Sequence, residues 1–151
     1  MILRFLALFF IIQTVNGYAQ IVVSNNPPMN TEEYIVNNVL LGDDLNTSNY
    51  TSVGFANGIG YFDGFNSNIG FDEGVVLSTG GIEFVSNGFG AGSGVSGDSD
   101  LELALNAINL NWNVNNVTVL EFDFVAESES VAFNYVFGSS EYTSYTCTQY
   151  N

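Results

Sequence analysis

The chain has 151 residues, with 16 aspartate and glutamate side chains, a single basic residue at Arg4 and no histidine. Beyond residue 4 no cationic side chain exists to neutralise phosphates, so binding to nucleic acid and direct binding to anionic membranes are excluded. Ser–His and Cys–His catalysis, Schiff-base lysines and arginine clamps are excluded on the same ground. The remaining partners are neutral molecules, cations and other proteins.

The N-terminal segment has the organisation of a secretory signal peptide. A basic start at Arg4 is followed by an apolar run over residues 5–12 and by the small residues Gly17 and Ala19. The run is far shorter than the roughly 20 apolar residues that a membrane-spanning helix requires. We therefore predict a signal peptide over residues 1–19 and one exported domain over residues 20–151. This domain contains 16 acidic side chains and no basic one.

The first part of the predicted domain alternates between strand and helix. Residues 21–23 are a short β-prone run. Asn30, with Glu33 three residues later, predicts a helix start, and Gly42 predicts its end. Residues 45–55 alternate loosely between polar and apolar side chains, which favours a strand.

The middle of the chain is rich in turn residues. We interpret residues 54–74 as a folded loop region anchored by aromatic side chains, residues 75–77 as a short buried strand and residues 82–85 as a further strand. Residues 86–97, which are mostly glycine, serine and asparagine, predict a flexible stretch.

The last elements have the clearest periodicity. Ser99 with Glu102 predicts a capped second helix, whose apolar residues recur at helical spacing. Residues 117–125 and 131–137 each alternate apolar and polar side chains, and residues 127–130 separate them. This pattern predicts an antiparallel hairpin.

Carboxylates beside glycine and asparagine suggest calcium sites. Ca²⁺ takes six to eight oxygens from carboxylates, amides and carbonyls, and two clusters supply such groups: Asp63, Asn66 and Asn68 in one, and Asp98, Asp100 and Glu102 in the other. Asp72 is a further candidate ligand. The alternative is that these residues only cap helices and face solvent in turns. No transition metal is expected, because the chain has no histidine and only Cys147 as a thiol.

Two further motifs allow other functional interpretations. Residues 92–97 match the glycine pattern of dinucleotide-binding loops, but Asp98 and Asp100 follow at once and would repel a pyrophosphate, so no nucleotide is expected. Paired carboxylates can also hydrolyse glycosidic bonds, and Trp112 could orient a sugar. A glycoside hydrolase or a carbohydrate-binding module is therefore the alternative to a non-enzymatic domain.

Several segments taken in order resemble a known family, the choice-of-anchor L domain of bacterial surface proteins. Residues 60–80 read GYFDGFNSNIGFDEGVVLSTG. The other segments that carry the resemblance are residues 31–42, 97–101, 119–124 and 133–142. Single segments are weakly specific, whereas the ordered set covers nearly all of residues 31–151.

The resemblance implies an exported, non-enzymatic surface domain that precedes a C-terminal sorting or anchoring module. Such modules include those of type IX secretion. The family usually has two acids before the tyrosine that corresponds to Tyr142, where this chain has Ser140 and Glu141. Glu141 is therefore the one candidate cation ligand at this point. The family pattern also continues beyond Asn151, so the resemblance implies a truncated domain with its anchor absent.

Together these observations predict a mainly β fold: an antiparallel β-sandwich or a jelly-roll-like pair of sheets with two short helices. The predicted function is that of a secreted or cell-surface bacterial domain in adhesion or matrix interaction, stabilised by Ca²⁺. Its ligand would be extracellular, either a glycan or another surface protein. A purely structural spacer in a long surface protein is a further alternative.

Overall fold

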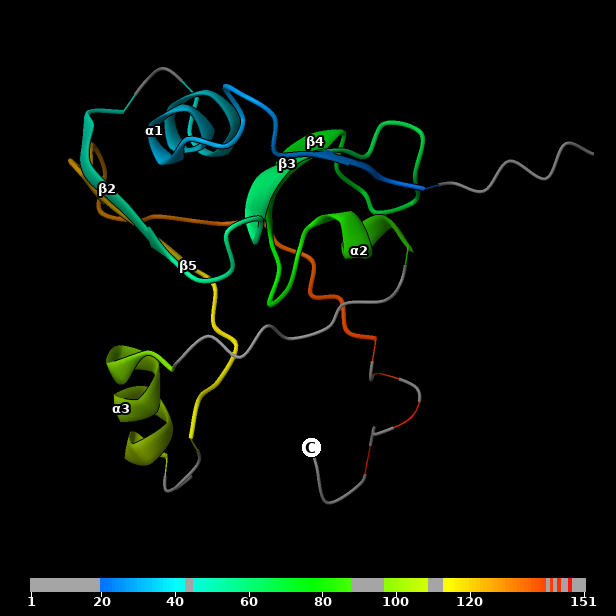
Figure 1. Cartoon of the computed structure of the whole chain (residues 1–151). Coiled ribbons are helices and arrows are strands. Elements are labelled where there is room, and N and C mark those ends of the chain that lie inside the picture. The colour runs from blue at the N-terminus through cyan, green and yellow to red at the C-terminus, as the bar shows by residue number, and fades with distance from the viewer. Residues whose placement is uncertain are drawn as a thin grey trace, which may run out of the picture.

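The computed structural model describes residues 20–42, 45–87, 97–108 and 113–140, together with residues 142, 144 and 147. Within these residues the fold is mainly β, with two antiparallel sheets and short helices, which confirms the predicted class (Figure 1). The predicted signal peptide and most of the predicted flexible stretch at 86–97 lie outside the described residues, as does Trp112.

The larger sheet has the order β1-β3-β4, with β1 at Val22–Ser24, β3 at Ile59–Asp63 and β4 at Glu73–Leu77. Both pairings are antiparallel. The strand β3 was missed by the sequence analysis, which placed residues 54–74 in a loop region. Its glycine and aspartate residues resemble those of turns, whereas the structure uses Gly60 as a buried strand residue that lies close to β1.

The central strand β3 contributes Phe62 to the core. The Phe62 side chain is 9% exposed, and its strand partner across the ladder is Gly74. A Cβ atom at Gly74 would lie 2.7 Å from Cε1 of the Phe62 ring, so the missing side chain gives the ring its space. The glycine in β4 is therefore a packing requirement of β3.

The smaller sheet is a ribbon of β2, Thr47–Val53, and β5, Val119–Phe124. The ladder shifts its register between Ser48 and Thr51, where Asn49 adopts a φ of 55°. This is the irregularity expected of a β-bulge, which adds a residue to one strand and increases the local twist.

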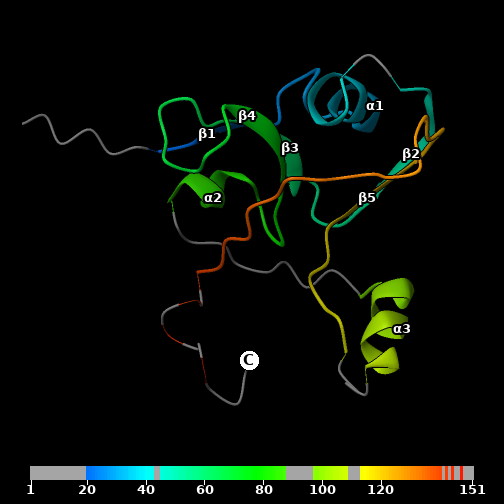
Figure 2. The same ribbon diagram turned by 180° about the vertical axis from the view of Figure 1, so that it is seen from behind.

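The predicted hairpin of residues 117–125 with residues 131–137 is wrong. The first strand exists as β5, but its partner is β2, and residues 131–137 are extended without a backbone hydrogen bond to any other described residue. Alternating side chains identify a strand and its buried face but carry no information about its partner. Figure 2 shows the orange segment running from the β2–β5 ribbon back towards β3.

The first helix begins as α1, Glu32–Tyr34, and continues as a π-helical stretch, η1, at Ile35–Leu40. It ends before Gly42, whose φ of 68° confirms the predicted stop. The predicted cap at Asn30 is wrong by one residue, because Thr31 is the N-cap and its side chain makes no capping hydrogen bond.

A polar network holds this helix on β2. Asn37 donates through Nδ2 to the Tyr50 hydroxyl at 3.0 Å, and Thr47 and Tyr50 share a hydrogen bond of 2.7 Å between their hydroxyls. All three groups are partly buried, where an unpaired polar group would destabilise the fold. The network therefore fixes the position of the ribbon relative to the helix.

The remaining helices depart further from the prediction. Residues 82–85, predicted as a strand, lie largely in α2, Glu83–Asn87. A short apolar run is compatible with either structure. The second predicted helix is confirmed as α3, Ser99–Ala107, but Asp98 and not Ser99 is its N-cap, and α3 has no buried residue.

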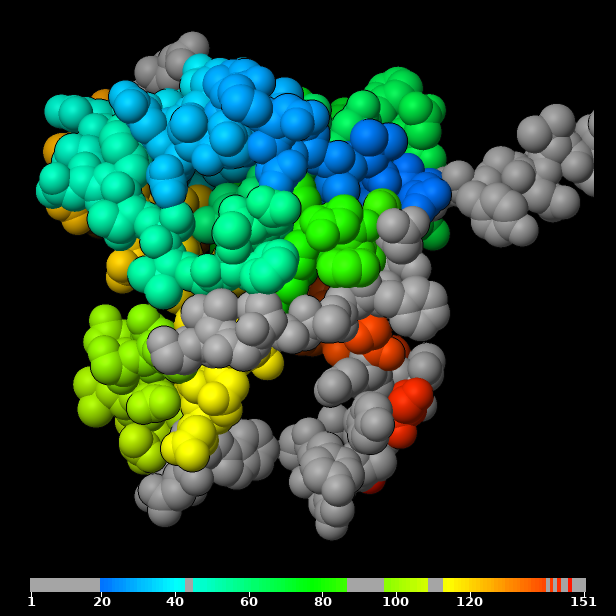
Figure 3. Space-filling model, in the orientation of Figure 1, coloured from blue at the N-terminus to red at the C-terminus, as the bar shows by residue number. Residues whose placement is uncertain are grey.

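The described core is small. Its buried apolar side chains come from the first helix, the larger sheet and the segments just before α2 and β5: Ile35, Val36, Phe62, Ile82 and Val117. Eighteen large apolar residues of the described part are exposed. The space-filling view in Figure 3 shows α3, in yellow-green, outside the body formed by β1–β4 and the first helix. Much apolar surface is thus left for contacts outside the described fold.

Candidate functional site

The loop between β3 and β4 carries one predicted cluster. Asp63 ends β3, and its Oδ1 accepts a hydrogen bond of 2.9 Å from the backbone N–H of Phe65. The N–H of Gly64 donates to the carbonyl oxygen of Asp72 at 2.8 Å and closes the hairpin. Asn66 and Asn68 follow within this one turn, so the cluster of Asp63, Asn66 and Asn68 shares a single hairpin with the separate candidate Asp72.

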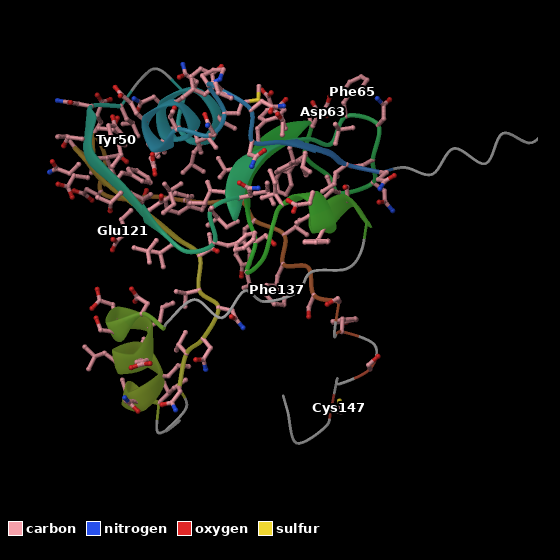
Figure 4. The ribbon with its side chains drawn as sticks, in the orientation of Figure 1. Tyr50, Asp63, Phe65, Glu121, Phe137 and Cys147 are labelled. Atoms are coloured by element: carbon pink, nitrogen blue, oxygen red, sulfur yellow. The ribbon has the colours of Figure 1, made fainter. Side chains whose placement is uncertain are left out.

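The electrostatics of the hairpin are unbalanced. Asp63 lies directly opposite Glu73 in the antiparallel ladder, and both carboxylates are exposed. Like charges opposite each other destabilise a sheet, and the described residues contain no lysine, arginine or histidine to offset them. Figure 4 shows Asp63 and Phe65 where the hairpin projects from the sheet.

Tyr61 is the neighbour that responds to this charge. Its hydroxyl donates to Oε2 of Glu73 at 2.8 Å. That hydrogen bond, with smaller contributions from desolvation and from the charges of Glu73 and Asp63, raises the pKa of Tyr61 to about 12. The hydroxyl therefore remains a hydrogen-bond donor throughout the physiological pH range.

The second predicted cluster lies at the start of α3. Oδ1 of Asp98 accepts hydrogen bonds of 3.0 Å from the backbone N–H groups of Asp100 and Leu101. Asp100 and Glu102 occupy the first turn, where carboxylates interact favourably with the helix dipole. Each carboxylate thus has a structural role at the helix terminus, as expected of residues that cap a helix.

The two clusters are not brought together. The β3–β4 hairpin and α3 lie at opposite sides of the molecule (Figures 1 and 2). Glu141 lies outside the described residues. Among the residues that the structure does describe, no three Asp, Glu, His or Cys side chains gather closely enough to hold a metal ion. A cation at either cluster would therefore depend on amide, carbonyl or water oxygens, and the Ca²⁺ site stays a prediction.

The outer face of the β2–β5 ribbon carries polar residues that the sequence analysis did not select. Asn49 donates through Nδ2 to Oδ2 of Asp123 at 2.6 Å, and the Thr51 hydroxyl lies 3.4 Å from Oε2 of Glu121. These four side chains line an open trough of about 530 Å³. The alternating positions of Glu121 and Asp123 predicted a solvent-exposed face of this strand. Only the pairing with β2 places the Asn49 amide and the Thr51 hydroxyl on the same face.

The chemistry of the ribbon trough, as we call this surface, suits a neutral polyhydroxyl or cationic ligand. Carboxylates accept hydrogen bonds, while the Asn49 amide and the Thr51 hydroxyl can both donate and accept. Anionic ligands are disfavoured, because Glu121 and Asp123 would repel them without compensation. The trough is open, so it resembles a recognition surface more than an enclosed reaction site.

A second, smaller concavity of about 220 Å³ lies where the first helix meets the ends of β2 and β3. The carboxylate of Glu32 accepts a hydrogen bond from the Ser52 hydroxyl in this concavity. That bond, together with a hydrogen bond to the Glu32 backbone, lowers the pKa of Glu32. Glu32 is therefore anionic at neutral pH and joins the helix to the ribbon.

The family model of the choice-of-anchor L domain matches residues 22–151 of the chain. The chain belongs to this family. The match confirms the resemblance and extends it to the first strand, β1. The choice-of-anchor family is surface-associated, so this choice-of-anchor L domain is a cell-surface or secreted protein domain.

The remaining comparisons add no relative. Neither a curated protein nor a solved structure matched the chain. Of the helices within the described residues, none has the length and apolar character needed to cross a membrane.

Proposed function

We propose that this choice-of-anchor L domain is an exported, non-enzymatic domain of the bacterial cell surface that acts in adhesion or matrix contact and is stabilised by Ca²⁺. The observation that carries the Ca²⁺ part is the pair of Asp63 and Glu73, which face each other without a basic partner. In such a chain, dissolved cations are the available counter-charge. The N-terminal signal peptide and an anchor module after the domain belong to the same proposal.

Thermal melting tests the Ca²⁺ part. The exported protein is melted in millimolar CaCl₂, in NaCl of the same ionic strength, and with a chelator. Specific binding to the folded state raises stability by about 2.7 kcal/mol when Ca²⁺ exceeds its dissociation constant a hundredfold. We expect CaCl₂ to raise the melting temperature above the value in matched NaCl. Equal melting temperatures in the two salts would remove Ca²⁺ from the proposal.

Two variants locate the cation. Asp63→Asn removes one carboxylate from the β3–β4 hairpin, and Asp123→Asn makes the same change in the ribbon trough, outside the predicted clusters. Both positions are exposed residues of the two sheets. We expect the Ca²⁺-specific shift to shrink in Asp63→Asn and to remain in Asp123→Asn. The opposite result would place the cation in the trough.

Carbohydrate binding is the second candidate, and the ribbon trough is the observation that favours it. A glycan array probed with the exported protein, and repeated with Asp123→Asn, tests this function. Signal that is lost in the variant supports glycan recognition as the adhesive activity. A hydrolysis screen on polysaccharides accompanies the array, and turnover abolished by a single carboxylate substitution would overturn the non-enzymatic proposal. No ligand in either assay would favour a structural spacer.

A further inference from the structure

The most exposed apolar segment of the described chain is residues 131–137, which we call the apolar arm. Its large side chains are mostly in solvent: Val131 at 52%, Phe133 at 58%, Tyr135 at 83%, Val136 at 55% and Phe137 at 82% exposed. The backbone is extended and has no hydrogen bond to another described residue. Phe137 is labelled in Figure 4, where the arm leaves the sheets.

An extended segment of this kind can accept a strand. Its unpaired N–H and C=O groups form a template for a ladder with another chain, and alternating side chains then provide specificity. Patches of exposed apolar residues of this extent mark interaction surfaces in soluble proteins. A second strand would complete this ladder.

The charge distribution favours a second copy of the same chain. The chain carries a net charge of −15, which opposes self-association in general. Residues 130–140, however, contain no charged side chain, and the nearest acid before them is Glu129. Two copies that meet along the apolar arm therefore approach where their mutual repulsion is smallest.

The arm is also complementary to itself. An antiparallel pairing centred on Asn134 places Val131 opposite Phe137 and Phe133 opposite Tyr135, all on one face. A two-fold interface requires such self-complementarity, because the same residues serve both partners. We propose that the apolar arm pairs with the arm of a second copy as an antiparallel two-stranded ladder around Asn134.

The area involved sets the strength of this association. Aromatic side chains bury about 200 Å² each. The exposed fractions of the three aromatic residues of the arm correspond to about 900 Å² in two copies, and a two-stranded ladder, whose faces stay open, covers only part of this area. Stable complexes bury about 1,200 Å² or more. The dimer is therefore weak and concentration-dependent.

Sedimentation equilibrium of the exported protein tests the pairing. Raising NaCl from about 0.01 M to about 1 M shortens the Debye length from about 30 Å to about 3 Å and screens the repulsion. We expect a monomer–dimer equilibrium whose dimer fraction rises with NaCl. In hydrogen exchange, the amides of residues 131–137 should become protected as the dimer fraction rises.

Matched variants assign the interface. Tyr135→Glu adds a charge to the arm, and Leu103→Glu adds the same charge to the exposed side of α3, where Leu103 is 69% exposed. Asn134→Pro and Tyr135→Pro each remove one backbone N–H donor. Hydrogen-bonded and non-hydrogen-bonded positions alternate along an antiparallel ladder, so one of the two variants removes a ladder hydrogen bond. We expect Tyr135→Glu and at least one proline variant to raise the dissociation constant at least about tenfold, while Leu103→Glu leaves it unchanged.

Three results would overturn the proposal. The first is a protein that remains monomeric at the highest soluble concentration in about 1 M NaCl. The second is a dimer that Tyr135→Glu and both proline variants leave intact, which would place the interface elsewhere. The third is protection of residues 131–137 that does not depend on concentration, which would mean that the chain covers its own arm.

Discussion

Single residues in β3 decide how closely its neighbours pack, and Gly60 is the sharpest case. A Cβ atom at Gly60 would lie 2.7 Å from the carbonyl oxygen of Ser24 and would overlap Cδ1 of the buried Ile82. The end of the Ile82 side chain can move, whereas the backbone of β1 is held in place by its pairing with β3. A larger residue at this position must therefore displace the first strand.

We predict that Gly60→Ala lowers the free energy of unfolding by about 1–3 kcal/mol, the usual penalty of overpacking. Urea denaturation followed by circular dichroism measures the change. Gly138→Ala is the matched control, because its new methyl group meets nothing within 4 Å. The control should stay within about 0.5 kcal/mol of the original protein. Equal effects of the two substitutions would contradict the described packing.

Tyr61 gives a spectroscopic test of the β3–β4 hairpin. Its pKa, raised to about 12 by the hydrogen bond to Glu73, stabilises the fold below the ordinary value of 10.0, and this contribution is lost as the pH rises through 12. In an ultraviolet titration of tyrosinate, Tyr61→Phe should remove a late-ionising component, and Glu73→Gln should move that component towards the ordinary range. A titration unchanged by Glu73→Gln would contradict the hydrogen bond.

At the scale of residues, the sequence indicates which acidic side chains belong to the candidate sites. It does not indicate which hydrogen bonds each of them makes. Asp63 and Asp98 were predicted as loop acids because turn-forming residues stand beside them, whereas the structure places Asp63 at the end of β3 and Asp98 at the N-cap of α3. Their tasks, closing an aspartate turn and capping α3, depend on which backbone N–H groups point at them. Asn49 and Thr51 were missed, because their partners on β5 are about 70 residues away along the chain.

Among the elements, the β2–β5 ribbon depends on one unusual backbone position. Asn49 combines a φ of 55° with a hydrogen bond from its side chain to Asp123. Glycine adopts the left-handed conformation of Asn49 without strain, so Asn49→Gly removes only an exposed hydrogen bond. We predict that it lowers the free energy of unfolding by less than about 1 kcal/mol. Asn49→Val should cost about 1–2 kcal/mol more, because a β-branched residue is strained in the left-handed region.

Chemical denaturation of the two Asn49 variants separates these contributions. Ser48→Val, a neighbouring strand position without a positive φ, serves as the control for the added apolar side chain. If Asn49→Val were as stable as Asn49→Gly, the left-handed conformation at the bulge would be refuted.

The elements also show where periodicity stops being informative. The strands β2 and β5 and the helix α3 were predicted with small errors at their ends, because each has a sustained pattern or a clear cap. The partner of β5 was predicted wrongly, since strand pairing is a property of the whole chain. The strand β3 was missed because its small and acidic residues are those of turns, although it lies at the centre of its sheet.

At the scale of the whole molecule, the charge distribution gives a simple test of export. Arg4 is the only cleavage site for trypsin in the chain, and cleavage of the predicted signal peptide would remove it. We predict that the exported protein, even when unfolded in urea, gives no tryptic fragment. Mass spectrometry of the intact and digested protein checks this outcome. A mass that still includes Arg4 would show that residues 1–19 are retained.

The apolar arm has a consequence for the material properties of the protein. A strand has two edges, so an arm that pairs along one of them still offers the other, and stacking of that kind has no natural end. Glu127 and Glu129, placed just before the arm, act as charged gatekeepers against it. Replacing both glutamates by glutamine would remove this protection. Fibrils are therefore expected to form in the Glu127→Gln, Glu129→Gln double variant under conditions in which the original protein stays soluble.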